Sequence, residues 1–436
     1  MHHLLVTIGS HGDTHPFVGI GATLRERGHR VTVVANGHFE SLIRAAGLEF
    51  RELGTAEEYL KIIDSMDLWH PVHGFKAVFE RGVLPAVRPT FDIVKELYVP
   101  GETIVTAHAI AFGARLAQEV FGVPLATIHL APSVFRSVHD APRFAYMNWL
   151  RRLPHPVIRG FHRLIDWGAV DPILAKPLNA FRAELGLPPV KRIIHDWWMS
   201  PQRVIGLFPE WFSKPQPDWP PQVRLTGFPL YDERGVHALS PELSAFLDAG
   251  APPVAFTFGS AMTQSRPQLL ASAEACRLAG LRGLLLTRHR EQVPTDLPAG
   301  VRHFDYAPFS ELLPRCAALV HHGGIGTTAQ ALAAGVPQVI MPLAHDQHDN
   351  AARVRRLGVG AEIPTKKYQA AHVADVLRNF LADPAAPARC RAIADRFKGH
   401  DPLAVTCDLI EELGTGDLVG SASADGIVPV DRRPLG

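Results

Sequence analysis

The stretch Leu319-Val-His-His-Gly-Gly-Ile-Gly-Thr-Thr-Ala-Gln-Ala-Leu-Ala-Ala-Gly-Val-Pro337 determines how the rest of the sequence is interpreted. Its apolar beginning predicts a buried strand that ends at His321, and residues 327–334 predict a helix. The turn between them contains three glycines, Gly323, Gly324 and Gly326. A glycine-rich turn before a helix presents backbone N–H groups and the positive end of the helix dipole to an anion. His322, Thr327 and Thr328 add side-chain donors, so the stretch favours phosphate binding over a turn that only connects two elements.

Two common phosphate-binding motifs do not fit this turn. A dinucleotide fingerprint belongs in the first βαβ unit and is followed after about 20 residues by an acid that binds the ribose. A P-loop requires Gly-Lys-Ser or Gly-Lys-Thr, and neither follows here.

Working outward, both halves of the chain alternate between strand and helix patterns. In the first half we predict strands at 4–8, 30–35, 101–107 and 124–130, and helices at 16–27, 38–46 and 112–121. In the second half we predict strands at 254–258, 284–287, 317–321 and 338–341, and helices at 268–279 and 327–334. This alternation indicates an α/β protein with parallel, doubly wound sheets.

The expected domain boundaries follow from composition. Residues 209–222 hold five prolines and are interpreted as a linker between an N-terminal domain, 1–208, and a C-terminal domain, 223–395. Residues 396–413 are expected to form a helix that packs back on the N-terminal domain, and 414–436 a flexible tail.

The composition limits the function classes. The 436 residues are 47% apolar and 20% charged, and the net charge of +1 provides no overall attraction for nucleic acid. The four cysteines, Cys276, Cys316, Cys390 and Cys407, are too scattered for a zinc site or a disulfide framework, which favours the cytoplasm. No stretch approaches the ~20 apolar residues of a membrane span, although a helix lying on a membrane surface stays open.

Several motifs together resemble those of family 1 nucleotide-sugar glycosyltransferases. They are His322-Gly-Gly-Ile-Gly-Thr327, Gly335-Val-Pro337, Pro342-Leu-Ala-His-Asp346-Gln347 with Asn350, Tyr306-Ala-Pro-Phe309 and Phe258-Gly-Ser260. The order of the two domains also fits, and the likeness is strongest to the bacterial branch that glycosylates antibiotics, sterols and flavonoid-like acceptors. The resemblance implies the GT-B fold, two facing Rossmann-like domains with a cleft between them.

The resemblance also implies which residues bind the donor. Ser260, His322, Gly324, Gly326 and Thr327 would hold the diphosphate, and Asp346 and Gln347 the sugar hydroxyls. Tyr306 stands where plant members carry the Trp that stacks on the base, and Phe309 is the alternative. Gln330 stands where UDP-specific members carry a Glu that binds both ribose hydroxyls, which favours a dTDP-6-deoxyhexose such as dTDP-rhamnose over UDP-glucose.

The candidate catalytic segment is Gly9-Ser-His-Gly-Asp13-Thr-His-Pro16, at the end of the first predicted strand. By resemblance Asp13 is the general base of an inverting transfer, with His108 as its partner and His11 and His15 as rival bases. An Asp at this place is also a good N-terminal cap for the following helix, and the two roles are compatible.

The remaining interpretations concern metal, acceptor and function class. The segment from His345 to Asp349 is not expected to bind a metal, and no cofactor is expected. Aromatic and Met side chains that suit an apolar acceptor such as a flavonoid are Trp69, Phe75, Phe79, Phe135, Phe144, Met147 and Trp149. A sugar-nucleotide epimerase, a nucleotide-sugar-binding protein without catalysis and a lipid or sterol transferase stay open as alternatives. The last would use the basic residues Arg143, Arg151, Arg152, Arg159 and Arg163.

Overall fold

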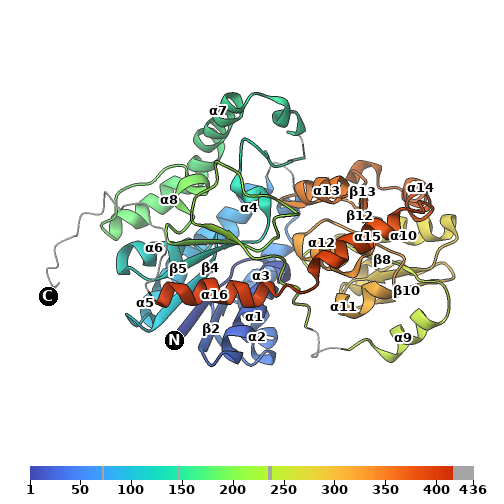
Figure 1. The fold of residues 1–436 in the computed structure, drawn as a ribbon, viewed down its shortest axis with the longest axis horizontal. Coiled ribbons are helices and arrows are strands. Elements are labelled where there is room, and N and C mark those ends of the chain that lie inside the picture. The colour runs from blue at the N-terminus through green and yellow to red at the C-terminus, as the bar shows by residue number, and fades with distance from the viewer. Residues whose placement is uncertain (71–72, 146, 234–237, 416–436) are drawn as a thin grey trace.

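The computed structural model describes residues 1–70, 73–145, 147–233 and 238–415. Within these residues the strands form two parallel sheets, each at the centre of one half of the molecule (Figure 1). The prediction of two facing Rossmann-like domains with a cleft between them is therefore confirmed. None of the described helices combines the length and apolar character that crossing a bilayer requires.

The N-terminal sheet has the strand order β3-β2-β1-β4-β5-β6-β7. Its strands are β1 (His2–Val6), β2 (Arg30–Ala35), β3 (Glu49–Glu52), β4 (Thr103–His108), β5 (Leu125–His129), β6 (Arg203–Gly206) and β7 (Val223–Leu225). The central strands are apolar on both sides, as expected when helices cover both faces. Along β1, Leu4 and Val6 pack into one core and Leu5 into the other.

The helices of this half run from α1 to α8. They are α1 (His11–Glu26), α2 (Glu40–Ala45), α3 (Ala56–Ile63), α4 (Gly74–Val78), α5 (Leu84–Leu97), α6 (Phe112–Phe121), α7 (His155–Ile165) and α8 (Asp171–Glu184). Short 3₁₀ or π turns are η1 (Gly37–Phe39), η2 (Met66–Trp69), η3 (Phe79–Val83), η4 (Pro132–Phe135), η5 (Asn148–Arg152), η6 (Asp166–Val170) and η7 (Ile193–Trp197). Helix α6 ends at Gly122, whose φ of +69° gives the left-handed cap that stops the helix.

The C-terminal sheet has the order β10-β9-β8-β11-β12-β13. Its strands are β8 (Val254–Thr257), β9 (Gly283–Leu286), β10 (Val301–Phe304), β11 (Ala318–His321), β12 (Gln338–Ile340) and β13 (Gly360–Glu362). Its helices are α9 (Pro241–Asp248), α10 (Arg266–Ala279), α11 (Phe309–Leu312), α12 (Ile325–Ala334), α13 (Gln347–Arg356), α14 (Ala370–Leu381) and α15 (Ala386–Ala394). Short turns are η8 (Arg290–Gln292), η9 (Leu313–Arg315), η10 (Thr365–Lys367) and η11 (Asp395–Phe397).

The predicted start of the C-terminal domain is wrong. Strand β7, which the sequence analysis placed at the start of the C-terminal domain, pairs in parallel with β6, with Val204 opposite Val223. It therefore belongs to the N-terminal sheet, and the linker follows it instead of preceding it. The local pattern of three residues after a proline-rich segment contains no information about which strand they pair with.

The last helix, α16 (Pro402–Thr415), returns to the N-terminal domain and packs against α1, β4 and β5 (Figure 1). Arg27, the C-cap residue of α1, forms ion pairs with Asp408 at 2.7 Å and Glu411 at 2.6 Å. Residues 414 and 415 lie in this helix and not in the expected tail, and 416–436 lie outside the described residues.

Candidate active site

A cavity of about 610 Å³ lies between the two domains. The N-terminal domain contributes the loops that follow β1, β2, β4 and β5, and the C-terminal domain those that follow β8, β11 and β12. In parallel α/β sheets the carboxyl ends of the strands are where ligands bind. The two sheets therefore direct their ligand-binding edges at one shared space, which we call the main cavity.

The glycine turn before α12 is shaped by close contacts. Gly323 has φ +95°, and a Cβ on it would lie 2.8 Å from Cγ2 of Ile340, so no other residue fits there without strain. Gly324 is the N-cap of α12, and no side chain caps this helix. The first N–H groups of α12 are therefore available to a ligand, and Gly324, Gly326 and Thr327 line the main cavity.

The two adjacent histidines have different surroundings. His321 is fully buried, its Nε2 lies 2.9 Å from Oε1 of Gln338, and its Nδ1 accepts the N–H of Gly323 at 3.1 Å. This histidine fixes the turn. His322 lines the main cavity, and its Nδ1 is buried without a hydrogen-bond partner in the structure.

Burial lowers the pKa of His322 to about 4, so the imidazole is neutral at pH 7 and has one N–H to donate. Its ring lies directly against the backbone of two glycines. A Cβ on Gly324 would come within 2.6 Å of Nε2 of His322, and one on Gly259 within 3.0 Å. Of the predicted diphosphate-binding residues, Ser260, His322, Gly324, Gly326 and Thr327 all line this one cavity.

The loop before α13 places Asp346 and Gln347 in the same cavity. The amide Nδ2 of Asn350 donates to Oδ2 of Asp346 at 2.7 Å and to the carbonyl of Gly323 at 2.9 Å, so this loop is tied to the glycine turn. Oε1 of Gln347 accepts the N–H groups of Leu343 and Ala344, so this side chain has only its NH₂ group to offer a ligand.

Burial raises the pKa of Asp346 to about 7, the hydrogen bond from Asn350 opposes the shift, and the nearby charge of Asp13 adds to it. A group with that pKa changes its protonation state near neutral pH.

The two acidic side chains of the 345–349 segment contact different partners. Asp346 faces the main cavity and Asn350, whereas Asp349 forms an ion pair with Arg353 at 2.7 Å and accepts the N–H of Arg143 at 3.0 Å. No group of three or more His, Cys, Asp or Glu side chains arranged to hold a metal ion occurs in the described part of the chain. That the activity requires no metal stays a prediction.

Asp13 is the third residue of α1 and lines the main cavity. Its Oδ2 accepts the backbone N–H of Ser10 at 2.6 Å and the Ser10 hydroxyl at 3.0 Å. Its other oxygen, Oδ1, forms no hydrogen bond within the described residues. Ser10 is the N-cap of α1, and Asp13 at position N3 completes a capping box with one oxygen, so Asp13 is not itself the N-cap that the sequence suggested. That Asp13 acts as a base stays a prediction.

The structure separates the three histidines proposed around Asp13. His108 lines the main cavity, and its Nδ1 donates to the carbonyl of Ile8 at 3.0 Å, which leaves Nε2 as an acceptor. No hydrogen bond joins it to Asp13 within the described residues. His11 and His15 lie outside the cavity lining, and His15 contacts Glu233 at 3.0 Å. Burial lowers the pKa of His11 to about 3. Their location makes the two rival bases the weaker candidates.

The predicted acceptor side chains divide into two groups. Trp69, Phe75, Phe79 and Phe144 line the main cavity. Phe135 does not, because it is buried in the core and stacks on Trp219 with ring centroids 4.3 Å apart. Trp149 is 49% exposed and contacts Phe161, and Met147 is not part of the cavity wall. Aromatic content therefore identified segments that reach the cavity but not which of their side chains line it.

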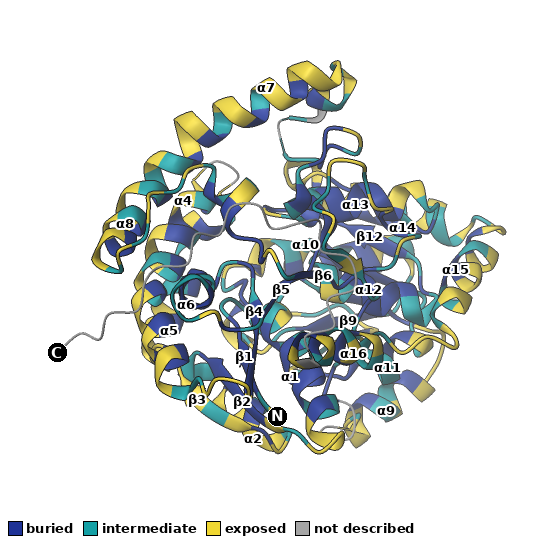
Figure 2. Cartoon of the chain, turned by 60° about the vertical axis from the view of Figure 1, so that its left-hand side comes forward, coloured by how far each residue is buried: buried dark blue, intermediate teal, exposed yellow. Residues whose placement is uncertain are grey.

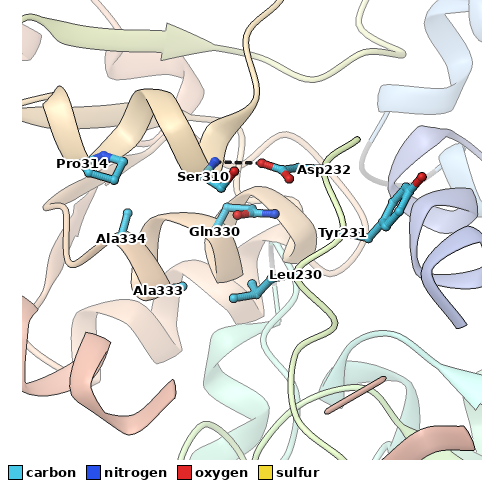
Figure 3. A pocket seen from close by; sticks show the side chains of 8 residues that line it. All are labelled: Leu230, Tyr231, Asp232, Ser310, Pro314, Gln330, Ala333 and Ala334. Carbon is cyan, nitrogen blue, oxygen red and sulfur yellow. Dashed lines mark hydrogen bonds between the residues drawn. The ribbon is translucent and has the colours of Figure 1, made fainter. Parts of the chain in front are cut away.

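A second cavity of about 290 Å³ lies beside α12 and contains Gln330. Its wall also includes Tyr231, Asp232 and Ser310, and Figure 3 shows Gln330 between Ser310 and Leu230. Oδ2 of Asp232 accepts the N–H of Ser310 at 2.7 Å. Thr327 in the main cavity and Gln330 in the second are one helical turn apart, so both cavities lie along the same side of α12.

Tyr306 and Phe309 line neither cavity. The hydroxyl of Tyr306 donates to the carbonyl of Asp232 at 2.9 Å, and the guanidinium of Arg288 lies 4.9 Å from the centre of its ring. Phe309 is partly buried and packs in the core beneath α11. Tyr306 thus supports the loop that lines the second cavity, and its role in base stacking stays a prediction.

Sequence reasoning missed several polar groups of the main cavity. Among the residues it missed, the cavity wall holds buried atoms that have no hydrogen-bond partner within the described residues: Oη of Tyr59, Nε1 of Trp198 and both ring nitrogens of His129. A buried polar atom without a partner costs free energy unless a ligand or water satisfies it. Nothing in the local sequence marks these residues, because their cavity positions depend on the assembled fold.

Comparisons with known proteins agree with this geometry. Residues 3–139 match the glycosyltransferase family 28 N-terminal domain, and residues 284–411 match the erythromycin biosynthesis protein CIII-like C-terminal domain. The O-mycaminosyltylonolide 6-deoxyallosyltransferase of Streptomyces fradiae is 32% identical over 94% of this chain and 96% of its own length. The chain is a family 1 GT-B glycosyltransferase.

Other relatives and solved structures similar to this glycosyltransferase are named for different compounds. The sterol 3-beta-glucosyltransferase UGT80A2 of Arabidopsis thaliana is 28% identical over 93% of this chain and 64% of its own length. The structure of the glycotransferase of kitacinnamycin covers 94% of this chain and 98% of its own, with a TM-score of 0.72 and 21% identity. The spinosyn rhamnosyltransferase SpnG complexed with thymidine diphosphate covers 94% and 100%, with a TM-score of 0.64 and 18% identity. This enzyme is thus a glycosyltransferase of the antibiotic and sterol type.

Proposed function

We propose that the enzyme transfers a sugar from a nucleotide diphosphate donor to a hydroxyl of a small apolar acceptor, with inversion at the anomeric carbon. The observation that carries the proposal is that Asp13 and the open N-terminus of α12 line one cavity from opposite domains. A base on the acceptor side and an anion site on the donor side are the two groups that a direct displacement needs.

In the proposed reaction, Oδ1 of Asp13 takes the proton of the acceptor hydroxyl while the oxygen of that hydroxyl attacks the anomeric carbon of the donor sugar. The bond between this carbon and the diphosphate oxygen breaks, and the electron pair leaves with the nucleoside diphosphate. Hydrogen bonds stabilise the negative charge that develops on the diphosphate; the donors are the N–H groups of Gly326 and Thr327 and the imidazole of His322. These donors are fixed by the fold before the reaction, so we propose that no metal ion is needed.

For the donor we propose a dTDP-6-deoxyhexose such as dTDP-rhamnose, with UDP-glucose as the second choice. Gln330 lies one turn beyond the diphosphate-binding residues, in the second cavity, where a nucleoside attached to that diphosphate can reach it. A neutral amide lacks the charge-assisted pair of hydrogen bonds that a carboxylate makes to both ribose hydroxyls. The thymidine diphosphate in the SpnG structure and the deoxysugar in the name of the Streptomyces fradiae relative support the same choice.

For the acceptor we propose an apolar molecule with several oxygen atoms, of which a flavonoid or another polyphenol is a small example. The wall of the main cavity combines aromatic side chains such as Phe75, Phe79 and Phe144 with the unpaired donors of Tyr59, Trp69 and Trp198. An apolar cavity with a few placed polar groups is typical of sites that bind such ligands. We place the reaction in the cytoplasm, which the four free cysteines support.

A competition assay with dTDP-rhamnose and UDP-glucose tests the donor. The wild type should prefer dTDP-rhamnose, and Gln330→Glu should shift the preference toward UDP by about 1 kcal/mol, the size of one hydrogen-bond difference. Gln338 lies on β12 outside both cavities, but Gln338→Glu is unsuitable as a control because the Gln338 side chain is hydrogen-bonded to His321. Gln369→Glu, which precedes α14, is the matched control. A clear preference for UDP-glucose that Gln330→Glu leaves unchanged would contradict the assignment.

A further inference from the structure

The helical segment around α7 projects from the N-terminal domain (Figure 1), and much of it is coloured as exposed in Figure 2. Eleven large apolar side chains are exposed in the described residues, and four lie within residues 149–167. They are Trp149 (49% exposed), Val157 (49%), Leu164 (57%) and Trp167 (76%). We call residues 149–167 the α7 ridge. Such a concentration of exposed apolar side chains marks a binding surface.

The helical spacing places three of these side chains along one side of the ridge. Val157 and Leu164 are seven residues apart, so two helical turns bring them to the same side of α7. Trp167 follows one turn later in η6, which continues the helix. The rings of Trp149 and Phe161 are 5.6 Å apart, which extends the surface to the neighbouring turn.

The α7 ridge is also basic. Between Asp140 and Asp166 the sequence contains no Asp or Glu, and it contains five arginines, Arg143, Arg151, Arg152, Arg159 and Arg163. Arg152, Arg159 and Arg163 are exposed and form no ion pair within the part of the chain that the structure describes. Because the whole chain has a net charge of only +1, this charge is a local property of the ridge.

Of the two flanking acids, Asp140 neutralises one arginine of this group, Arg151, and Asp166 is occupied by arginines outside it. The charges of Arg152, Arg159 and Arg163 are not offset by an ion pair within the described residues. Asp140 pairs with Arg151 and Arg353, both at 3.0 Å. Asp166 is fully buried and pairs with Arg136 at 2.5 Å and Arg192 at 3.3 Å.

The ridge is joined to the wall of the main cavity. Arg136 lines that cavity, and its guanidinium donates to Asp166 and to the carbonyl of His162, both at the inner side of the ridge. Phe144, which also lines the cavity, precedes the ridge by five residues. A surface that binds the ridge therefore lies next to the part of the cavity proposed for the acceptor.

We propose that the α7 ridge docks on an anionic lipid bilayer and that the apolar acceptor enters the main cavity from the lipid phase. Exposed Trp and Leu side chains insert at the interface, and flanking arginines bind anionic headgroups. A second copy of the chain is the weaker occupant. A two-fold contact places the same patch against itself, so unpaired arginines would face one another. This inference rests on the apolar acceptor of the proposed function.

The test is flotation of the purified full chain with vesicles of phosphatidylcholine mixed with phosphatidylglycerol, and with vesicles of phosphatidylcholine alone. We expect binding to the anionic vesicles that weakens at high salt. The double variant Arg159→Gln with Arg163→Gln should bind roughly 25-fold more weakly, about fivefold per charge near an anionic surface. Leu164→Ser with Trp167→Ser should also reduce binding at least tenfold. Leu270→Ser on α10, where the side chain is equally exposed at 57%, is the matched control and should bind like the wild type.

Vesicle binding needs neither donor nor turnover, so its failure is distinguishable from a failure of the proposed transfer. Thermal stabilisation by dTDP should be the same in all variants, which shows that they are folded. Absence of wild-type binding to anionic vesicles, or equal binding by both double variants, overturns the inference. A dimer in solution that Leu164→Ser dissociates would assign the ridge to a second copy and also overturn it.

Discussion

Replacing Gly326 by Ala separates the binding of the diphosphate from the stability of the fold. Gly326 is the second residue of α12 and lines the main cavity. A Cβ on it would meet no protein atom within 4 Å, so the fold has room for the methyl group. The space that the methyl group fills is the space that the diphosphate is proposed to occupy. Any loss of binding therefore reports on the ligand and not on a damaged turn.

The magnitudes of the two effects have opposite signs. Ala in place of Gly within a helix stabilises the fold by about 0.5–1 kcal/mol, because the unfolded chain has less freedom to lose. A phosphate oxygen displaced from the N–H groups of the first turn loses a charge-assisted hydrogen bond of about 1.5–3 kcal/mol. We therefore expect dTDP to bind roughly 10- to 100-fold more weakly to an enzyme that is no less stable without ligand.

Calorimetric titration with dTDP, paired with thermal unfolding of the ligand-free enzyme, measures both quantities. Gly160→Ala on α7 is the matched control, because a Cβ there also meets nothing within 4 Å, and dTDP affinity should not change. Gly323→Ala should instead unfold at lower temperature, since φ is +95° and Ile340 is 2.8 Å away. Wild-type dTDP affinity in a folded Gly326→Ala variant would refute the placement of the diphosphate at this helix.

Further expectations concern the base, the imidazole, the sugar site and metals. Asp13→Asn keeps the shape of the helix cap but cannot accept a proton, so turnover should fall by roughly 10²–10⁴ with little change in dTDP affinity; near-normal turnover of a weakly acidic hydroxyl would contradict this. His322→Ala should weaken dTDP binding by about 1.5–3 kcal/mol, and calorimetry that finds no loss would disprove the site model. We expect the carboxylate form of Asp346 to accept sugar hydroxyls, and burial raises its pKa to about 7, so kcat/KM for the donor should rise as the pH increases through 7. Asp346→Asn should flatten that rise, and Asp13→Asn should move it to lower pH by removing a neighbouring negative charge. Activity should survive EDTA, and a loss that Mg²⁺ or Mn²⁺ restores would indicate a metal site.

Most of the fold could be predicted because its signals are local. Residues 31–34 are four consecutive β-branched residues, and the observed strand has the predicted bounds 30–35. Residues 112–121 are followed by Gly122, which is suited to a helix cap. The domain to which β7 belongs could not be predicted, because it depends on the pairing of its three residues with β6. Local periodicity predicts that an element exists, whereas its sheet neighbours depend on contacts far apart in sequence.

The residues of the candidate site also differ in how far local sequence could predict them. The glycine turn follows directly after β11, and Asp13 lies in the first turn of the helix that follows β1. The carboxyl ends of parallel strands meet at one edge of a sheet, so the sequence indicates both positions. The aromatic residues lie in irregular segments, which have no periodicity that would predict whether a side chain faces the cavity or the core. Phe135 and Phe144 are nine residues apart, yet one packs on Trp219 and the other lines the main cavity.

The return of α16 to the N-terminal domain has a consequence for how the protein is made. Cys407, Ile410 and Leu413 belong to the same apolar core as Leu5 and Ile20, and the Sγ of Cys407 lies 3.7 Å from the carbonyl of Ile20, 387 positions earlier in the chain. Ribosomal synthesis at ~5–20 residues per second separates these partners by roughly 20–80 s. During that interval the nascent N-terminal domain exposes the apolar face of α1 that α16 later covers. The domain that is synthesised first is therefore completed last, and a nascent chain stalled before residue 402 should bind general chaperones through this face.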